Sequence, residues 1–89
     1  MNINNYTYIL RCSDNTFYTG WTNNIERRLY IHNLGKGSRY TRARLPVKLV
    51  YLEIFDDKIA AMKREAEIKK MSREQKLKLI ESYTCIKID

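Results

Sequence analysis

The strongest constraint on the fold is a pair of strand-like segments separated by a short turn. Residues 6–12 and 17–21 are rich in aromatic and β-branched side chains, which favour strands. Residues 13–16, between them, are the small polar types that form tight turns. The two segments therefore predict an antiparallel β-hairpin, against which the rest of the chain must pack.

A helix is predicted directly after the hairpin, over about residues 24–34. Asn23 is suited to cap its first turn, and Glu26 three positions later completes a capping box. Arg28 and His32 are four residues apart in this helix, so both side chains should lie on the same face.

A third strand is predicted after a polar, basic loop. The loop covers residues 35–46, and its Leu-Pro ending favours an extended backbone. Residues 47–55 then have the composition of a strand. In this strand the alternation predicts that Val50, Leu52 and Ile54 share the face that packs in the core.

Two helices should complete the chain. The first is predicted over residues 59–71, and Ser72 with Gln75 forms a capping box that begins the second, in which Leu77 and Ile80 should face inward. The order β-β-α-β-α-α predicts an α+β fold with a small three-stranded antiparallel sheet flanked by helices. A chain of 89 residues has room for one such domain.

The positive charge is concentrated in one part of the sequence. There are 17 Lys and Arg against 10 Asp and Glu, and the net charge of +7 is accounted for by seven residues in a stretch that has no acidic residue. We call these seven residues the basic tract: Arg27, Arg28, Lys36, Arg39, Arg42, Arg44 and Lys48. A gathered tract of this kind favours binding to a nucleic-acid backbone through counterion release, although a solvated basic loop would have the same composition.

Composition also argues against several classes of protein. Cys12 and Cys85 lie far apart with no CxxC motif, which gives no support for a zinc knuckle and suits a reducing compartment. No signal-peptide pattern and no apolar run of about 18 residues is present. We therefore expect a cytoplasmic protein without a membrane partner, and a monomer by default.

One carboxylate lies where an apolar side chain is expected. Glu65 falls between Ala61 and Ile68 on the apolar stripe of the predicted helix at 59–71. A partly buried carboxylate costs several kcal/mol unless a cation or hydrogen bonds compensate it. Its partner could be Arg64, Lys69 or a metal ion.

A phosphodiester-cleaving site needs a base, a cation on the phosphate and usually a metal on a hard oxygen ligand. Tyr8 and Tyr18 in the hairpin, Arg28 with His32 in the first helix, and Glu65 would supply these parts. Each residue alone has an ordinary structural explanation, so the hypothesis depends on all five meeting in space.

Several segments together resemble the GIY-YIG nuclease superfamily, and especially its short, single-domain bacterial members. The two name-giving tripeptides are similar to Tyr-Thr-Tyr and Tyr-Thr-Gly here, and the helix with the family's arginine and the segment with its glutamate follow at compatible spacing. The matching segments are residues 6–8, 18–20, 24–33, 35–42, 44–51 and 61–65. The chain departs from the family in lacking the first glycine and isoleucine, and in having no asparagine after Glu65.

The resemblance implies an endonuclease with one Mg²⁺ or Mn²⁺ ion. Glu65 would be the protein ligand of the metal, Tyr18 or else Tyr8 the general base, and Arg28 the group that holds the scissile phosphate. His32 would position water or the leaving group.

DNA is the expected partner, with RNA as a possible one, bound mainly through the backbone. The expected nucleic-acid-binding residues are Arg27, Lys36, Arg39, Arg42, Arg44 and Lys48. Two alternatives remain open: a DNA- or RNA-binding module of the same fold without catalysis, and a protein-interaction domain.

Overall fold

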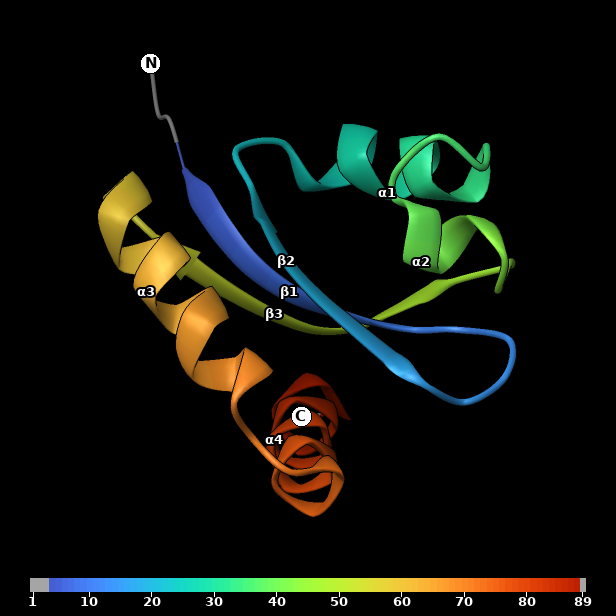
Figure 1. Cartoon of the computed structure of the whole chain (residues 1–89). Helices are drawn as coiled ribbons and strands as arrows, with labels where there is room; N and C mark the ends of the chain where they lie inside the picture. The colour runs from blue at the N-terminus through green and yellow to red at the C-terminus, as the bar shows by residue number, and fades with distance from the viewer. Residues whose placement is uncertain (1–3, 89) are drawn as a thin grey trace.

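The computed structural model describes residues 4–88 of the chain, with side chains as far as residue 83. Three antiparallel strands form one sheet, β1 (Asn5–Arg11), β2 (Phe17–Thr22) and β3 (Lys48–Phe55), in the order β2-β1-β3. The predicted hairpin is β1 and β2, and β3 pairs with the other side of β1 (Figure 1). The predicted α+β class and three-stranded antiparallel sheet are confirmed.

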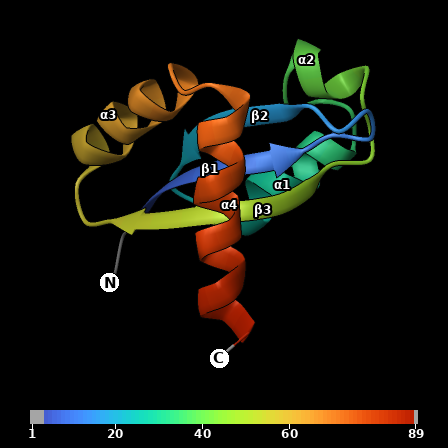
Figure 2. The same ribbon diagram turned by 90° about the horizontal axis from the view of Figure 1, so that it is seen from below.

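Helices cover both faces of this sheet. They are α1 (Ile25–Asn33), α2 (Arg39–Arg42), α3 (Lys58–Lys69) and α4 (Arg73–Ile88). The pair α1 and α2 lies on one face and the pair α3 and α4 on the other, with α4 crossing the strands (Figure 2). The predicted order is confirmed, and the four-residue α2 is an addition within the predicted basic loop. None of the helices in the described chain has the length and apolar character needed to cross a bilayer.

Alternating residues of the strands build two cores, one on each face. Tyr8, Leu10 and Cys12 pack toward α1, and Cys12 is buried as a free thiol. Ile9 packs on the opposite face with Ile68 of α3. The side chain of Cys85 lies outside the described residues.

The predicted core face of β3 is wrong, because the strand contains a β-bulge. Ile9 pairs with Tyr51 and Leu10 with Leu49, so Val50 is an extra residue on β3. As a result Val50 packs with Tyr51 toward α4 while Leu52 packs toward α1. Ile54 is 58% exposed.

The N-terminal caps of α1 and α4 lie at the predicted positions or within one residue of them. Asn24, one residue after the expected cap, accepts a hydrogen bond from the backbone N–H of Arg27 at the start of α1. The capping box at the start of α4 is confirmed, because Ser72 accepts from the Gln75 N–H and Gln75 accepts from the Ser72 N–H. Of the two residues expected to face inward on α4, Ile80 packs in the core, whereas Leu77 is 45% exposed.

The end of α1 is tied to the start of β3 by one side chain. Asn33 donates to the carbonyl of Val47 at 3.2 Å and accepts from its N–H at 2.9 Å. Val47 itself is buried, so without Asn33 these backbone groups would lack protein partners at this point. This amide therefore holds α1, which carries Arg28 and His32, in a defined position on the sheet.

We expect Asn33→Ala to lower the free energy of unfolding by about 1 to 3 kcal/mol, because it leaves a buried backbone pair unsatisfied. Urea denaturation followed by circular dichroism would measure the change. Asn23→Ala, in the exposed loop before α1, is the matched control and should change stability by less than about 0.5 kcal/mol. If both substitutions lower the free energy of unfolding equally, the two hydrogen bonds of Asn33 do not contribute specifically to stability.

Candidate active site

Four of the five predicted site residues meet on the α1 side of the sheet. In the hairpin register Tyr8 pairs with Gly20 and Leu10 with Tyr18, so the two tyrosines are diagonal neighbours on one face. Their ring centroids are 6.4 Å apart. The His32 ring of α1 lies against both, 6.1 Å from Tyr8 and 5.2 Å from Tyr18. We call Tyr8, Tyr18, Arg28 and His32 the tyrosine cluster.

A buried chain of hydrogen bonds runs through this cluster. The Tyr8 hydroxyl lies 3.1 Å from Nε2 of His32, and Nδ1 of His32 lies 2.8 Å from Oγ1 of Thr41. Thr41 in turn bonds to the Ser38 hydroxyl at 2.9 Å. Tyr8 and His32 are 1% and 0% exposed, so both ring nitrogens of His32 are satisfied inside the protein, away from water.

Two glycines make room for these rings. A Cβ atom at Gly20 would lie 2.6 Å from the Tyr8 hydroxyl oxygen, and one at Gly37 would overlap the His32 imidazole. Any larger residue at either position would displace a ring of the cluster. The glycine of the second tripeptide is thus required by the packing of the tyrosine in the first.

Burial keeps Tyr8 and His32 uncharged. Burial raises the pKa of Tyr8 to about 12, while the hydrogen bond with Arg28 opposes the rise. Burial also lowers the pKa of His32 to about 4, and the positive charge of Arg28 adds to this effect. At neutral pH the cluster therefore contains a neutral phenol, a neutral imidazole and one cation.

That cation, Arg28, lies between the cluster and a polar surface pocket. Its Nη2 donates to the Gly37 carbonyl at 3.1 Å, and hydrogen bonding with Tyr8 raises its pKa. It also lines a pocket of about 200 Å³ at the start of α1, which we call the Arg28 pocket. The lining residues are Thr22, Asn23, Asn24, Arg27, Arg28 and Ile31. Arg28 can therefore contact both the cluster and an anion entering from solvent.

Tyr18 lies at the edge of a second pocket. It is half-buried, and its ring stacks on Tyr40 of α2 with centroids 6.3 Å apart and planes tilted by 25°. We call this cavity of about 240 Å³ the Tyr18 pocket. Its lining residues are Phe17, Tyr18, Thr19, Tyr40, Lys69 and Lys76. Tyr18 is thus the tyrosine of the cluster that a ligand can reach, whereas Tyr8 is enclosed.

Glu65 is the predicted residue that does not join the hydrogen-bonded cluster. It lies on α3, which packs on the opposite face against β1 and β2. Its side chain is 20% exposed and forms an ion pair with Lys69, with 3.2 Å between Oε2 and Nζ. The carboxylate is nevertheless close enough that its charge contributes to the raised pKa of Tyr8. Lys69 also lines the Tyr18 pocket, so Glu65 contacts a residue of the pocket without lining the pocket itself.

The donor set fits a metal held by a single protein ligand. Among the described residues no group of three or more His, Cys, Asp and Glu side chains is placed to hold an ion. Glu65 has a hard, partly exposed carboxylate whose one partner here is an exposed lysine that water can replace. His32 cannot serve as a ligand, because both its ring nitrogens are already hydrogen-bonded.

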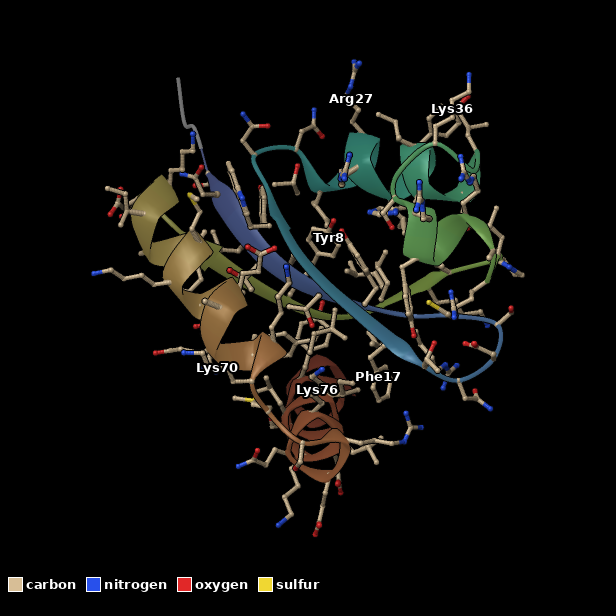
Figure 3. All side chains as sticks on the ribbon, viewed as in Figure 1. Tyr8, Phe17, Arg27, Lys36, Lys70 and Lys76 are labelled. Carbon is tan, nitrogen blue, oxygen red and sulfur yellow. The ribbon has the colours of Figure 1, made fainter. Side chains whose placement is uncertain are left out.

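Six of the seven residues of the basic tract belong to α1, α2 and the loops next to them, on the same side of the sheet as the cluster. Lys48 is the exception, because it pairs with Arg11 on β1 and alternates with Leu49, which packs toward α1, so its side chain lies on the other face. The exposed members of the tract are Arg27, Lys36, Arg39, Arg42 and Lys48. Arg27 and Lys36 extend away from the sheet beside α1 (Figure 3). Arg44 differs, because its Nε lies 3.0 Å from Asp14 and its guanidinium lies over the Tyr40 ring at 3.9 Å. The charge of Arg44 is therefore already partly neutralised.

Three residues of this region were not predicted to be part of the site. Lys69, four residues after Glu65, was expected only as a possible ion-pair partner, and its position in the Tyr18 pocket was not foreseen. Thr41 and Tyr40 reach the cluster from α2, a helix that composition alone presented as a loop. No periodic signal marks either residue, because a four-residue helix is too short to have one.

The single histidine of the chain allows a direct test of the buried network. In an NMR titration the His32 ring should protonate near pH 4, well below the value of about 6.5 for a free side chain. Because the unfolded state takes up the proton first as pH falls, folding stability should decrease between about pH 6.5 and 4, by on the order of 3 kcal/mol in total. A midpoint close to 6.5 would mean that His32 is solvated.

Comparisons with known proteins identify the family of this chain. Residues 4–78 match the model of the GIY-YIG catalytic domain. A UPF0213 protein of Syntrophus aciditrophicus is 64% identical over 85% of this chain and 88% of its own length, and one of Clostridium perfringens is 59% identical over 88% and 84%.

Solved structures give the same result. The solution NMR structure of a UPF0213 protein from Bacillus halodurans has a TM-score of 0.58 at 44% identity, covering 89% of this chain and 84% of that one. That of a protein from E. faecalis has a TM-score of 0.62 at 39% identity, covering 92% and 88%. The hairpin tyrosines, the α1 arginine and the α3 glutamate thus lie in a chain that belongs to the GIY-YIG catalytic-domain family of nucleases, with UPF0213 proteins among its close relatives.

Proposed function

We propose that the protein is an endonuclease that hydrolyses phosphodiester bonds in DNA with one divalent metal ion, Mg²⁺ or Mn²⁺. The observation that carries the proposal is the tyrosine cluster, in which two phenols, an imidazole and a guanidinium pack between two pockets. Partial burial of the Arg28 charge between phenols and a surface pocket carries a desolvation cost, as is common for charged groups at functional sites. A phosphate-cleaving site needs such a cation.

Tyr18 is the candidate general base. It faces the Tyr18 pocket, whereas Tyr8 is buried and its raised pKa keeps the phenol protonated. Tyr8 is better suited to orient its neighbours through its bonds to His32 and Arg28. His32, closed off from water, acts as a positioning residue for Tyr8 and not as the group that holds water.

Arg28 is the candidate phosphate-binding residue. The Arg28 pocket lies at the N-terminus of α1, where the helix dipole favours an anion. Arg27 adds a second guanidinium at the same rim. The phosphodiester would be held there, and its developing negative charge would be stabilised by Arg28.

Glu65 is the candidate metal ligand. A bound divalent ion would polarise the phosphodiester and favour deprotonation of water near it. Lys69 neutralises the carboxylate in this structure, so a metal ion would have to compete with this ammonium group. That ion pair is also the observation that favours the alternative function, a DNA-binding module in which Lys69 permanently replaces the metal.

The catalytic proposal predicts selective losses of activity. Glu65→Gln and Tyr18→Phe should each lower Mn²⁺-dependent cleavage of labelled DNA at least about 100-fold, because a metal ligand or a proton acceptor is removed. Both variants should bind DNA in EDTA as the parent does.

Glu67→Gln is the matched control for Glu65. It removes an exposed carboxylate of α3 that pairs with Arg64, and cleavage should be unchanged. Parent protein that binds DNA without any metal-dependent cutting would instead support the binding-module function.

The basic tract predicts a strong salt dependence of DNA binding. Contacts from five to seven of its residues would give a slope of log K against log salt of roughly −4.5 to −6.3 on duplex DNA. Arg42→Ala should reduce the slope by about 1, and Arg44→Ala by less, because Arg44 is already paired with Asp14. Lys78→Ala, on α4, is the control. A flat salt response would contradict nucleic-acid binding through this tract.

A further inference from the structure

The Tyr18 pocket is lined by several residues that have no role in the proposed cleavage reaction. It opens on the outer edge of β2, the edge strand of the sheet, so residues from both faces of that strand reach it: Phe17 from the α3 side and Tyr18 from the α1 side. Tyr40 closes it from α2. Phe17 and Lys76 of α4, which both line the pocket, are labelled next to each other in Figure 3.

Aromatic rings form the walls of the pocket and are held in place by neighbours. Tyr40 stacks on Tyr18, and the guanidinium of Arg44 covers its ring. The guanidinium of Arg73 lies 4.7 Å from the centroid of Phe17. These contacts occupy part of each ring's surface and restrain the rings, so a planar ligand that packs against the surface left open costs little side-chain entropy.

Two ammonium groups complete the pocket. Lys69 comes from the end of α3 and Lys76 from α4. The pocket also includes Thr19, whose hydroxyl has no hydrogen-bond partner among the described residues. A purely apolar ligand would leave the lysines unused, and a free phosphate would leave the aromatic walls unused. The combination matches a nucleotide, with its base against the rings and its phosphate at the lysines.

The pocket is continuous with both parts of the candidate active site. Tyr18 belongs to the tyrosine cluster, and Lys69 is ion-paired with Glu65. A nucleotide bound here would therefore present its phosphate to both. We propose that the Tyr18 pocket binds an unpaired DNA nucleotide next to the scissile phosphate, so that the enzyme prefers single-stranded or frayed DNA to a fully paired duplex.

This inference rests on the proposed function, because it assigns a substrate class to the same site. The reason for the preference is steric: a paired base remains stacked in its helix and cannot enter a pocket of about 240 Å³ at a strand edge. The basic tract would bind the backbone of either form.

Binding in EDTA, where no cleavage occurs, tests the inference. Fluorescein-labelled single-stranded DNA and a blunt duplex of equal length would be titrated with the full chain. Tyr40→Leu and Lys76→Met should weaken single-strand binding, the former about 5- to 150-fold, and leave duplex binding unchanged. The fluorescence of a 2-aminopurine in the single strand should fall on binding to the parent and not to Tyr40→Leu.

Matched variants separate the pocket from general effects. Tyr40→Phe keeps the ring and should retain single-strand affinity, which excludes misfolding as the cause. Tyr30→Leu removes a tyrosine that is 65% exposed on α1, and Lys78→Met an exposed lysine of α4; neither should have an effect.

Three results would overturn the inference. Equal affinity for single strand and duplex, or equal weakening of both by Tyr40→Leu, would reject the pocket while leaving the proposed endonuclease intact. Absence of binding to any DNA would reject the proposed function together with the inference.

Discussion

The hydrogen bond between Tyr8 and His32 is the interaction on which the site depends. It crosses from the central strand β1 to α1 and continues through Thr41 to α2, so one chain of polar contacts joins three elements. All of these groups are buried, where an unsatisfied hydroxyl or ring nitrogen costs more than in water. Any shift of α1 along the sheet would break the chain. The position of Arg28, one turn before His32, is fixed by the same contact.

The tyrosine cluster and Glu65, the two parts of the candidate site, differ in how firmly they are held. The tyrosine cluster is enclosed and hydrogen-bonded, and small movements within it are opposed by Gly20 and Gly37, where rings and backbone are already in contact. Within the part of the chain that the structure describes, Glu65 is held by an ion pair with an exposed lysine, a contact worth little in water. The tyrosine cluster is therefore preorganised for the proposed phosphate contact, while the proposed metal ligand is held by a weak ion pair that a cation could replace.

Local patterns predicted the parts of this structure that depend on local chemistry. The hairpin, the Ser72 and Gln75 capping box, and the placement of Arg28 with His32 on one helix face follow from spacing alone. The face of Val50 did not, because a bulge depends on how two strands pair and leaves no mark in either sequence. The contact between Thr41 and His32 could not be predicted either, because it depends on how the loop between α1 and α2 folds back. Hydrophobic periodicity carries no information about tertiary contacts of this kind.

The strand order lets residues from opposite faces of the sheet line one pocket. Arg28 and Glu65 come from helices on different sides, and a sheet with β2 in its interior would keep them apart. With β2 at the edge, Tyr18 on one face and Lys69 from the other meet in one pocket. An open edge usually invites pairing with another strand. Here helices and long side chains surround that edge, and the opening that remains is the Tyr18 pocket, with its aromatic walls and two lysines.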